Sequence, residues 1–457
     1  MGDELARAIA DHGVRTVRLM ANMPDGRLVG KYIAATHLAE MLPSLPNVAD
    51  VTFGLDVDNE PNVMTPSTWR GNLAELYLQP DVSTLVVDPR LPDLASVLCC
   101  FVLADGTAIP ECPRGMVIRL LDELTDRGFA MRAGFEVEFN AFEESIAVAR
   151  RRGYRGLTPL GGHPNSAYSV TKSLPAVRFM DAVTRRLDDL GIHWESWLDE
   201  GGAGQFELNL EPDDALRTAD NITRTRLALR EVAEEQGHCV TFMAKWHPDQ
   251  WGGGLHLNHS LWRDTESAFF DPTAPDNRSD TYRNWIGGLV ATMRGATALA
   301  QPNINSYRRF VELAGSPTTV TWSGDNKTTS MRAMAQSAGS ARAELRTPGS
   351  DANHYLVMAA ALAGGISGLD ERLEPPPPFE GSAWGLPPED GLQLPNSIRR
   401  ASAALDTDDR LRARFGDAFV DYWIGMLEWE WLSFHTTGGD PDLELTEWEL
   451  NRYFERV

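Results

Sequence analysis

Short apolar stretches alternate with turn-rich joints through residues 13 to about 105. In chain order they read VRTVRLMANM, VADVTFGLDV, LAELYLQPD, STLVVDP and ASVLCCFVLADG. Such short runs, bounded by turn-forming residues, are typical of β-strands, and helical periodicity is scarce among them. The pattern predicts a compact, mainly β N-terminal domain, which we place at residues 1–107.

The pattern changes after residue 107. Three segments show apolar residues at i, i+3 and i+4, begin near Pro or Asp and end at Gly, namely residues 113–128, 174–191 and 212–237. Strand-like stretches separate these predicted helices. A proline-rich surface excursion at residues 373–391 precedes further helical segments. Residues 108–457 are therefore predicted to form an α+β body with polar clusters on one sheet face and helices behind it.

The charge balance narrows the range of partners. With 42 Lys and Arg against 65 Asp and Glu, the 457-residue chain has a formal net charge of -23, which disfavours broad contact with nucleic acid or anionic lipid. No run approaches the roughly 20 apolar residues that cross a bilayer, and the first residues lack a secretion signal. The cysteines lack metal-site spacing: Cys99, Cys100, Cys112 and Cys239. We expect a reduced, cytoplasmic protein that acts on small molecules.

Two pairs of glutamates indicate a metal site. Glu136 and Glu138 stand two residues apart in the apolar segment AGFEVEFN, so both project from one strand face. Burying two such charges is costly unless a divalent cation lies beside them. In DEGGAGQFELNL the glycines would let Glu200 fold back beside Glu207. The alternative for this second segment is a solvated strand edge.

A third polar face lies in WGGGLHLNHSL, where strand alternation aligns His256, Asn258 and Ser260. The triple glycine resembles a loop that lets phosphate or substrate approach the backbone, although a strand histidine alone is more often structural. In RAELR the same alternation places Glu344 between two arginines. Together with Glu136, Glu138, Glu200 and Glu207, the residues His256 and Glu344 complete a set of six dispersed ligands for two divalent ions, which implies phosphoryl transfer.

Positive charge is concentrated in the same part of this acidic chain. The residues are Arg308, Arg309, Lys327, Arg332, Arg342 and Arg346. Guanidinium groups are well suited to carboxylates and phosphates, so the set indicates a site for an amino acid together with a nucleotide. The alternative is a surface ion-pair ladder.

These motifs, in this order, resemble those of the glutamine synthetase family. The resemblance runs through ELYLQPDVSTLVVDP, GFEVEF, GGAGQFELNL, TFMAK, GGGLHLNHSL, PNINSYRRF, DNKTTSMR and ARAELRTPGSDANHYL, nearly the whole chain. It implies a β-grasp N-terminal domain and a catalytic domain with six antiparallel strands in a curved funnel. It also implies a homo-oligomer of two stacked hexameric rings, a dodecamer with active sites at subunit boundaries.

The resemblance also assigns ligands for two or three Mg²⁺ or Mn²⁺ ions, a choice that suits carboxylate-rich ligation. Glu138, Glu200 and Glu207 match the ligands of the first metal, and Glu136, His256 and Glu344 match those of the second.

The same resemblance assigns the substrate contacts. Arg309 and Arg346 match arginines near the glutamate carboxylate and the transferred phosphate, Arg332 and Arg342 match those on the ATP phosphates, and Ser260 matches a nucleotide contact. Gly252 falls where the backbone meets the substrate amino acid. Three positions depart from the family: Asn258 replaces a phosphate-contacting histidine, Lys327 replaces an arginine, and Trp251 replaces an asparagine that helps hold glutamate.

The positions that bind ammonia in the family depart further from its pattern. Gly315 stands where ammonia-using relatives place a flap glutamate, and Gly54, or Asp56 if the alignment shifts, stands where they place the aspartate that binds ammonium. Trp384 replaces the adenylylated tyrosine. We therefore expect an ATP-dependent ligase that joins glutamate to an amine larger than ammonia through a γ-glutamyl phosphate, with a slight preference for aryl or alkyl amines.

Four alternatives stay open. The chain could be an ammonia-using glutamine synthetase, a non-catalytic assembly protein of this family, or a ligase for another acid. Glu312, Asp325 or a neighbouring subunit could also supply the missing base.

Overall fold

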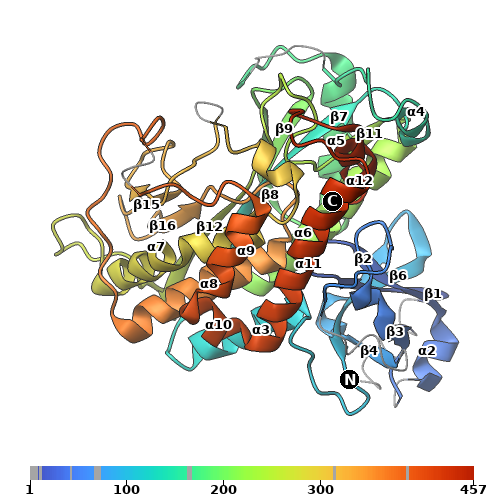
Figure 1. Cartoon of the computed structure of the whole chain (residues 1–457). Helices are drawn as coiled ribbons and strands as arrows, with labels where there is room; N and C mark the ends of the chain where they lie inside the picture. Colours follow the sequence, from blue (N-terminus) through green and yellow to red (C-terminus); the bar gives the residue numbers. More distant parts are fainter. Residues whose placement is uncertain are drawn as a thin grey trace.

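The computed structural model describes residue 9 and residues 13–41, 44–65, 74–161, 167–311, 315–387 and 391–457. It contains two sheets, each built largely from one part of the chain (Figure 1). The first has the strand order β2-β1-β6-β4-β3, with β5 paired to β6. Its strands are β1 Thr16–Asn22, β2 Leu28–Ala34, β3 Asn47–Ala49, β4 Glu75–Pro80, β5 Val86–Asp88 and β6 Leu91–Val102. The central neighbours β1 and β6 run parallel, as the first and last strands of a β-grasp sheet do.

Most of the predicted N-terminal strands are present, but one prediction is wrong. The segment VADVTFGLDV forms only the end of β3 and then the 3-10 helix η1, Asp50–Gly54. The turn lets Phe53 point inward, where it is fully buried and packs edge-on against Phe101 at 4.9 Å between ring centroids. A short helix, α2 (Ala35–Met41), also follows β2 and was not predicted.

The second sheet has the order β14-β15-β16-β12-β7-β9-β8. These strands are β7 Ala130–Phe142, β8 Trp194–Asp199, β9 Gln205–Leu210, β12 Leu255–Arg263, β14 Trp322–Ser323, β15 Met331–Met334 and β16 Arg342–Leu345. The short strands β10 (Asp213–Asp214) and β11 (Cys239–Thr241) pair with β7, and β13 (Glu266–Ser267) pairs with β12. Among the described residues the sheet is longer than the six antiparallel strands implied by the resemblance, and β14 and β15 run parallel.

The three helices predicted from periodicity are α3 (Pro113–Thr125), α5 (Leu174–Asp189) and α6 (Ala215–Glu235). The other described helices are α4 Ile146–Arg151, α7 Asp280–Ala300, α8 His354–Glu371, α9 Ile398–Asp406, α10 Asp409–Phe415, α11 Asp417–Thr436 and α12 Glu447–Tyr453, with short 3-10 turns η3 Val82–Thr84 and η4 Asn305–Arg308. Helices α7 and α8 pack backbone to backbone, because a Cβ at Gly288 would lie 2.1 Å from the Gly364 carbonyl oxygen.

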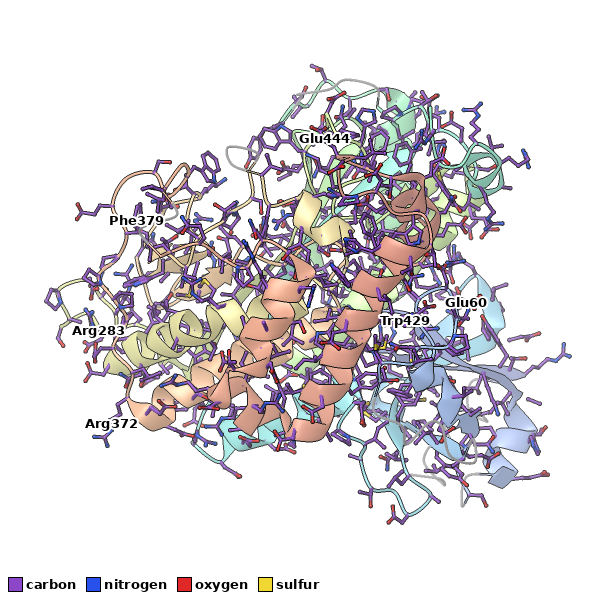
Figure 2. All side chains as sticks on the ribbon, viewed as in Figure 1. Glu60, Arg283, Arg372, Phe379, Trp429 and Glu444 are labelled. Carbon is purple, nitrogen blue, oxygen red and sulfur yellow. The ribbon has the colours of Figure 1, made fainter. Side chains whose placement is uncertain are left out.

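The two parts of the chain share one apolar core. Val17 and Phe101 of the first sheet and Phe135 of the second are almost fully buried in it. Polar contacts also join them: the indole of Trp429 on α11 donates to Asp56 at 2.9 Å, and Asp56 also accepts from the backbone N–H of Glu60 at 2.9 Å. Trp429 and Glu60 are labelled in Figure 2. The boundary between residues 107 and 108 stays a prediction. No helix in the described part of the chain is long and apolar enough to cross a membrane.

Candidate active site

The register of the second sheet brings together glutamates that are far apart in sequence. Glu138 of β7 lies opposite Glu207 of β9, and Glu136 lies opposite His256 of β12. On the other side of β12, its neighbour β16 sets Glu344 opposite Asn258. Because these strands are neighbours, side chains on one face of the sheet converge.

These side chains open into a cavity of about 350 Å³. Its lining includes all six predicted metal ligands, which are Glu136, Glu138, Glu200, Glu207, His256 and Glu344. It also includes the predicted substrate residues Trp251, Gly252, Arg309, Gly315, Lys327, Arg332 and Arg346. The remaining lining residues are Ala167, Tyr168, Ser316 and Trp384.

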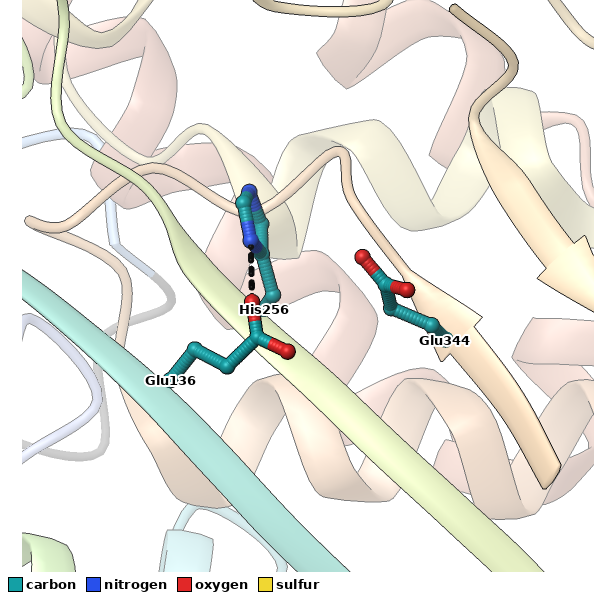
Figure 3. Close-up of side chains that lie close together, drawn as sticks. All are labelled: Glu136, His256 and Glu344. Atoms are coloured by element: carbon teal, nitrogen blue, oxygen red, sulfur yellow. Dashed lines mark hydrogen bonds and ion pairs between the residues drawn. The ribbon is translucent and has the colours of Figure 1, made fainter. Parts of the chain in front are cut away.

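Two groups within this lining have the geometry of metal ligands. One ligand atom from each of Glu136, His256 and Glu344 lies within 4.8 Å of the others, and the same is true of Glu138, Glu207 and His256. Figure 3 shows the first group, with Glu136 and Glu344 approaching His256 from different strands. Glu200 lines the cavity but belongs to neither compact group.

Hydrogen bonds fix the orientation of the carboxylates. Glu138 accepts from the side-chain amide of Gln205 at 3.0 Å and from the backbone N–H of Gly254 at 2.9 Å. Glu136 lies 2.9 Å from Nδ1 of His256 and accepts from the Asn258 amide at 2.9 Å. Such outer contacts hold ligand oxygens in place before a metal binds.

The electrostatics show that two of the carboxyls, those of Glu200 and Glu207, lack enough compensating positive charge. Burial, together with the nearby charge of Glu138, raises the pKa of Glu200 to about 7 and that of Glu207 to about 8. Burial also opposes ionisation of Glu136, but hydrogen bonds from His256 and Asn258 lower its pKa to about 2. Closely spaced carboxyls whose pKa values diverge in this way are typical of a site that needs a cation.

A divalent ion therefore fits the residues present. The donors are carboxylate oxygens and one imidazole, the set that Mg²⁺ and Mn²⁺ accept. Their buried positions would otherwise leave repelling charges with little solvent around them.

Positive side chains border the other side of the cavity. Arg309 is 4% exposed, and its guanidinium donates to the carbonyl oxygens of Thr347 at 2.9 Å and Arg346 at 3.1 Å. Arg346 donates to Glu344 at 2.6 Å, and Arg332 is bonded to the other oxygen of that carboxylate. Burial lowers the pKa of Arg309 to about 10, which leaves it charged at neutral pH. The cavity therefore offers fixed cations beside its acidic cluster.

Aromatic side chains form the remaining wall. The ring of Trp251 covers Gly201, where an added Cβ would lie 2.6 Å from the indole, and it also lies beside Gly315. The indole of Trp384 donates to the Ser316 carbonyl at 3.3 Å. Tyr168 meets the ammonium of Lys327 through its hydroxyl at 3.3 Å. Sequence reasoning missed Tyr168, because the segment around it shows neither strand alternation nor helical periodicity.

Three predicted ATP contacts are not among the described residues that line the cavity: Asn258, Ser260 and Arg342. Asn258 instead connects two charged side chains, since it donates to Glu136 and accepts from Arg342 at 3.0 Å. Ser260 accepts from the indole of Trp262 at 2.9 Å. Their roles as nucleotide contacts stay predictions.

The alternative bases have different positions. Asp56 is buried and accepts from Arg452 and Trp429, each at 2.9 Å, so it serves the packing of α11 and α12. Asp325 is exposed and pairs with Arg332. Glu312 lies outside the described residues. Gly54 ends η1 and carries no carboxylate.

The fold and this site define a glutamine synthetase-type catalytic domain. A family model described as the glutamine synthetase catalytic domain matches residues 110–453. The chain therefore belongs to the glutamine synthetase family, as its motifs predict.

Among known relatives, the chain is 31% identical to the glutamate–isopropylamine ligase of a Pseudomonas species, over 98% of this chain and 97% of the relative. It is 30% identical to the gamma-glutamylethanolamide synthetase of Streptomyces coelicolor, over 100% and 96% of the two chains. A solved GmaS complex with ADP superposes with a TM-score of 0.82 at 25% identity, covering 97% of this chain and 98% of that one.

Proposed function

We propose that the protein is an ATP-dependent ligase that joins the γ-carboxylate of glutamate to an amine larger than ammonia, through a γ-glutamyl phosphate. One observation carries the proposal. The six predicted metal ligands line one cavity together with Arg309, Arg332 and Arg346, while Gly315, packed beside Trp251, stands at the position of the ammonia-site flap carboxylate.

In the first step, a γ-carboxylate oxygen of glutamate attacks the γ-phosphorus of ATP and ADP leaves. Arg309 and Arg346 line the cavity and would bind the acid and the transferred phosphoryl group, and Gly252 would let the backbone approach the amino acid. Glu138, Glu200 and Glu207 would hold one divalent ion, and Glu136, His256 and Glu344 another. When bound, such ions neutralise the phosphate charge.

In the second step, the amine nitrogen attacks the acyl carbon, inorganic phosphate leaves and the nitrogen loses a proton. Trp251, Tyr168 and Trp384 give the amine an aromatic wall in place of a carboxylate. Such a wall favours an alkyl or aryl substituent and attracts an ammonium group through its ring faces. Water must be kept from the acyl phosphate during this step, because it would otherwise hydrolyse.

Two relatives support this acceptor class, because their names specify isopropylamine and ethanolamine as substrates. Both amines are small and larger than ammonia. We propose by the same resemblance that the protein forms hexameric rings, which light scattering after size-exclusion chromatography would test.

The decisive experiment measures ADP release with glutamate, Mg²⁺ or Mn²⁺, and a panel containing ammonium, isopropylamine, ethanolamine, aniline and putrescine. We expect kcat/KM for the best alkyl or aryl amine to exceed that for ammonium by about a hundredfold, with the γ-glutamylamide identified by mass spectrometry. Preference for ammonium would make the protein an ordinary glutamine synthetase. Absence of ATP and metal binding would place it among non-catalytic relatives, and a parallel panel of acids tests the choice of glutamate.

A second experiment tests whether Asp56 serves as the missing base. In Asp56→Asn the new amide N–H groups face the donors Arg452 and Trp429, so we expect a loss of about 1–3 kcal/mol in the free energy of unfolding. Turnover at a temperature where the variant is folded should change little. A stable variant without turnover would contradict the structural role of Asp56.

A further inference from the structure

A second cavity, of about 380 Å³, lies where the first sheet meets α6. The strands β1 and β2, drawn in blue in Figure 1, form one wall, and α6, the start of α8 and the C-terminal residue form the other. Its lining residues include Arg18, Leu28, Arg226, Leu227, Arg230 and His354. None of them lines the active-site cavity.

The lining is basic, although the chain as a whole is strongly acidic. Among the described lining residues are the side chains of Arg18, Arg226 and Arg230, and no Asp or Glu side chain. Lys31 also borders the cavity, but its ammonium donates to Asn47 at 3.0 Å. Arg18 lies 3.2 Å from the carboxylate of Glu231 outside the lining, and Arg230 donates to an oxygen of Val457, the last residue. Arginine side chains therefore outnumber the acidic groups around this cavity.

The spacing along α6 produces this concentration. Thr223, Arg226, Leu227 and Arg230 follow the i, i+3, i+4, i+7 pattern of a single helix face. Arg226 and Arg230 are one turn apart, and like charges at this spacing destabilise a helix. Both guanidinium groups also lie over the ring of Phe242, at 5.2 and 4.9 Å from its centroid. These two cations therefore contact the same ring.

Two buried nitrogen atoms beside the cavity lack a hydrogen-bond partner among the described residues. Arg226 is 7% exposed, and its Nε has no hydrogen-bond partner among the described residues, while its terminal nitrogen donates to the carbonyl oxygens of Ser350 and Ala352. His354 is 1% exposed; its Nε2 meets Thr223 at 2.9 Å, and its Nδ1 is likewise without a partner in the described part of the chain. Buried polar atoms of this kind indicate a missing partner.

We propose that this cavity is an effector site that binds a small organic anion, with a carboxylate or phosphate group on a short apolar stem. The anionic head would lie between Arg18, Arg226 and Arg230, which can donate in forked pairs. The stem would pack against Leu28 and Leu227. The site is independent of the reaction proposed above, since it shares no residue with the active site.

A chain of hydrogen bonds connects the two cavities. Arg226 holds the Ser350 carbonyl at 2.6 Å, and the Ser350 N–H donates to the Gly253 carbonyl at 3.0 Å. The next residue, Gly254, donates its N–H to Glu138 at 2.9 Å. An anion that binds Arg226 would change its bond to Ser350 and so shift the segment that positions Glu138. Binding at this cavity is thereby coupled to substrate binding in the active site.

The test is calorimetric titration of the full chain with two probes that share a stem, butyrate and monobutyl phosphate. We expect saturable binding of at least one probe, at one site per chain, and the comparison identifies the preferred head group. Arg230→Gln should weaken binding about tenfold, because one charged contact is lost. Leu28→Trp should abolish binding by filling the cavity without changing charge.

Two control variants locate the effect. Arg217→Gln removes an exposed arginine from the same helix, where it lies 3.6 Å from Asp213, and should leave binding unchanged. Arg346→Gln alters the active site and should also retain binding. The bound probe should shift KM for glutamate or for the amine at least about twofold, as a coupled site does.

The proposal is overturned if neither probe gives saturable binding, or if binding survives both Arg230→Gln and Leu28→Trp. Loss of binding in Arg346→Gln would place the anion in the active site and also overturn it. Binding without any change in KM would overturn the role as an effector site. Because binding is read without turnover, these outcomes are distinct from failure of the amine ligase proposal.

Discussion

Two cavities of similar size in this chain differ in their ionisable side chains. The active-site cavity, about 350 Å³, is lined by five glutamates and four cations, whereas the cavity against α6, about 380 Å³, has three arginines facing it and no Asp or Glu among its described lining residues. The net charge of -23 predicts neither the mixture of charges in the first cavity nor the basic lining of the second. The difference teaches that the local field depends on which strands and helix faces meet, because charges in an enclosed site are poorly screened by water.

The largest expected effect is at the acidic cluster. Glu138→Gln removes a charge that lies beside Glu207 and His256, so we expect kcat/KM to fall about a thousandfold and Mn²⁺ binding to weaken. Steady-state kinetics and metal titration measure both. Glu211→Gln, an exposed position just beyond β9, is the matched control. Normal turnover in Glu138→Gln would break the comparison, because the acidic cavity would then not require its charge.

The acidic cluster should also make metal binding depend on pH. The pKa values of about 7 for Glu200 and about 8 for Glu207 mean that both carboxyls hold protons in the metal-free protein below these values. A metal ion must displace those protons, so affinity should fall as pH decreases from 8 to 6, with a slope that approaches about a hundredfold per unit once both carboxyls are protonated. Calorimetry in buffers of different ionisation enthalpy would detect the released protons. Affinity independent of pH in this range would contradict the assignment.

The aromatic wall predicts a smaller, selective effect. Trp251→Ala should raise KM for the preferred alkyl or aryl amine about tenfold, because a ring contact and a cation–π contact are lost. KM for ATP should change little, and Trp251→Phe should restore most of the affinity for the amine. An equal rise in KM for ammonium and for the larger amine would show that Trp251 does not select the acceptor.

The smallest expected effect is at the basic cavity. A bound anion stabilises the folded state, so monobutyl phosphate in excess should raise the unfolding temperature by about 2 °C. Arg230→Gln should reduce this shift, whereas the Arg217→Gln control should keep it. An identical shift in all three proteins would reflect general salt effects and remove the contrast between the two cavities.

Helices with long, clear periodicity could be predicted from the sequence. The segments that became α3, α5 and α6 have apolar faces several turns long, and burial of such a face fixes the element. Short elements were harder. VADVTFGLDV has strand-like composition, but its Phe53 is buried by a 3-10 turn against Phe101, a contact made with a distant strand. Tertiary packing there overrides a local preference.

For the functional site, the sequence by itself determined which side chains share a strand face and, through its motifs, the glutamine synthetase family. Strand alternation is a local property, so Glu136 with Glu138 could be paired without a structure. Only the tertiary structure decided the register that sets Glu138 opposite Glu207 and Glu136 opposite His256, and it alone brought Tyr168 to the cavity. The basic cavity likewise depends on tertiary structure, because Arg18 of β1 and Arg226 of α6 line one cavity only after the strand has packed against the helix. Contacts between distant segments depend on the packing of the whole core, which no short stretch of sequence encodes.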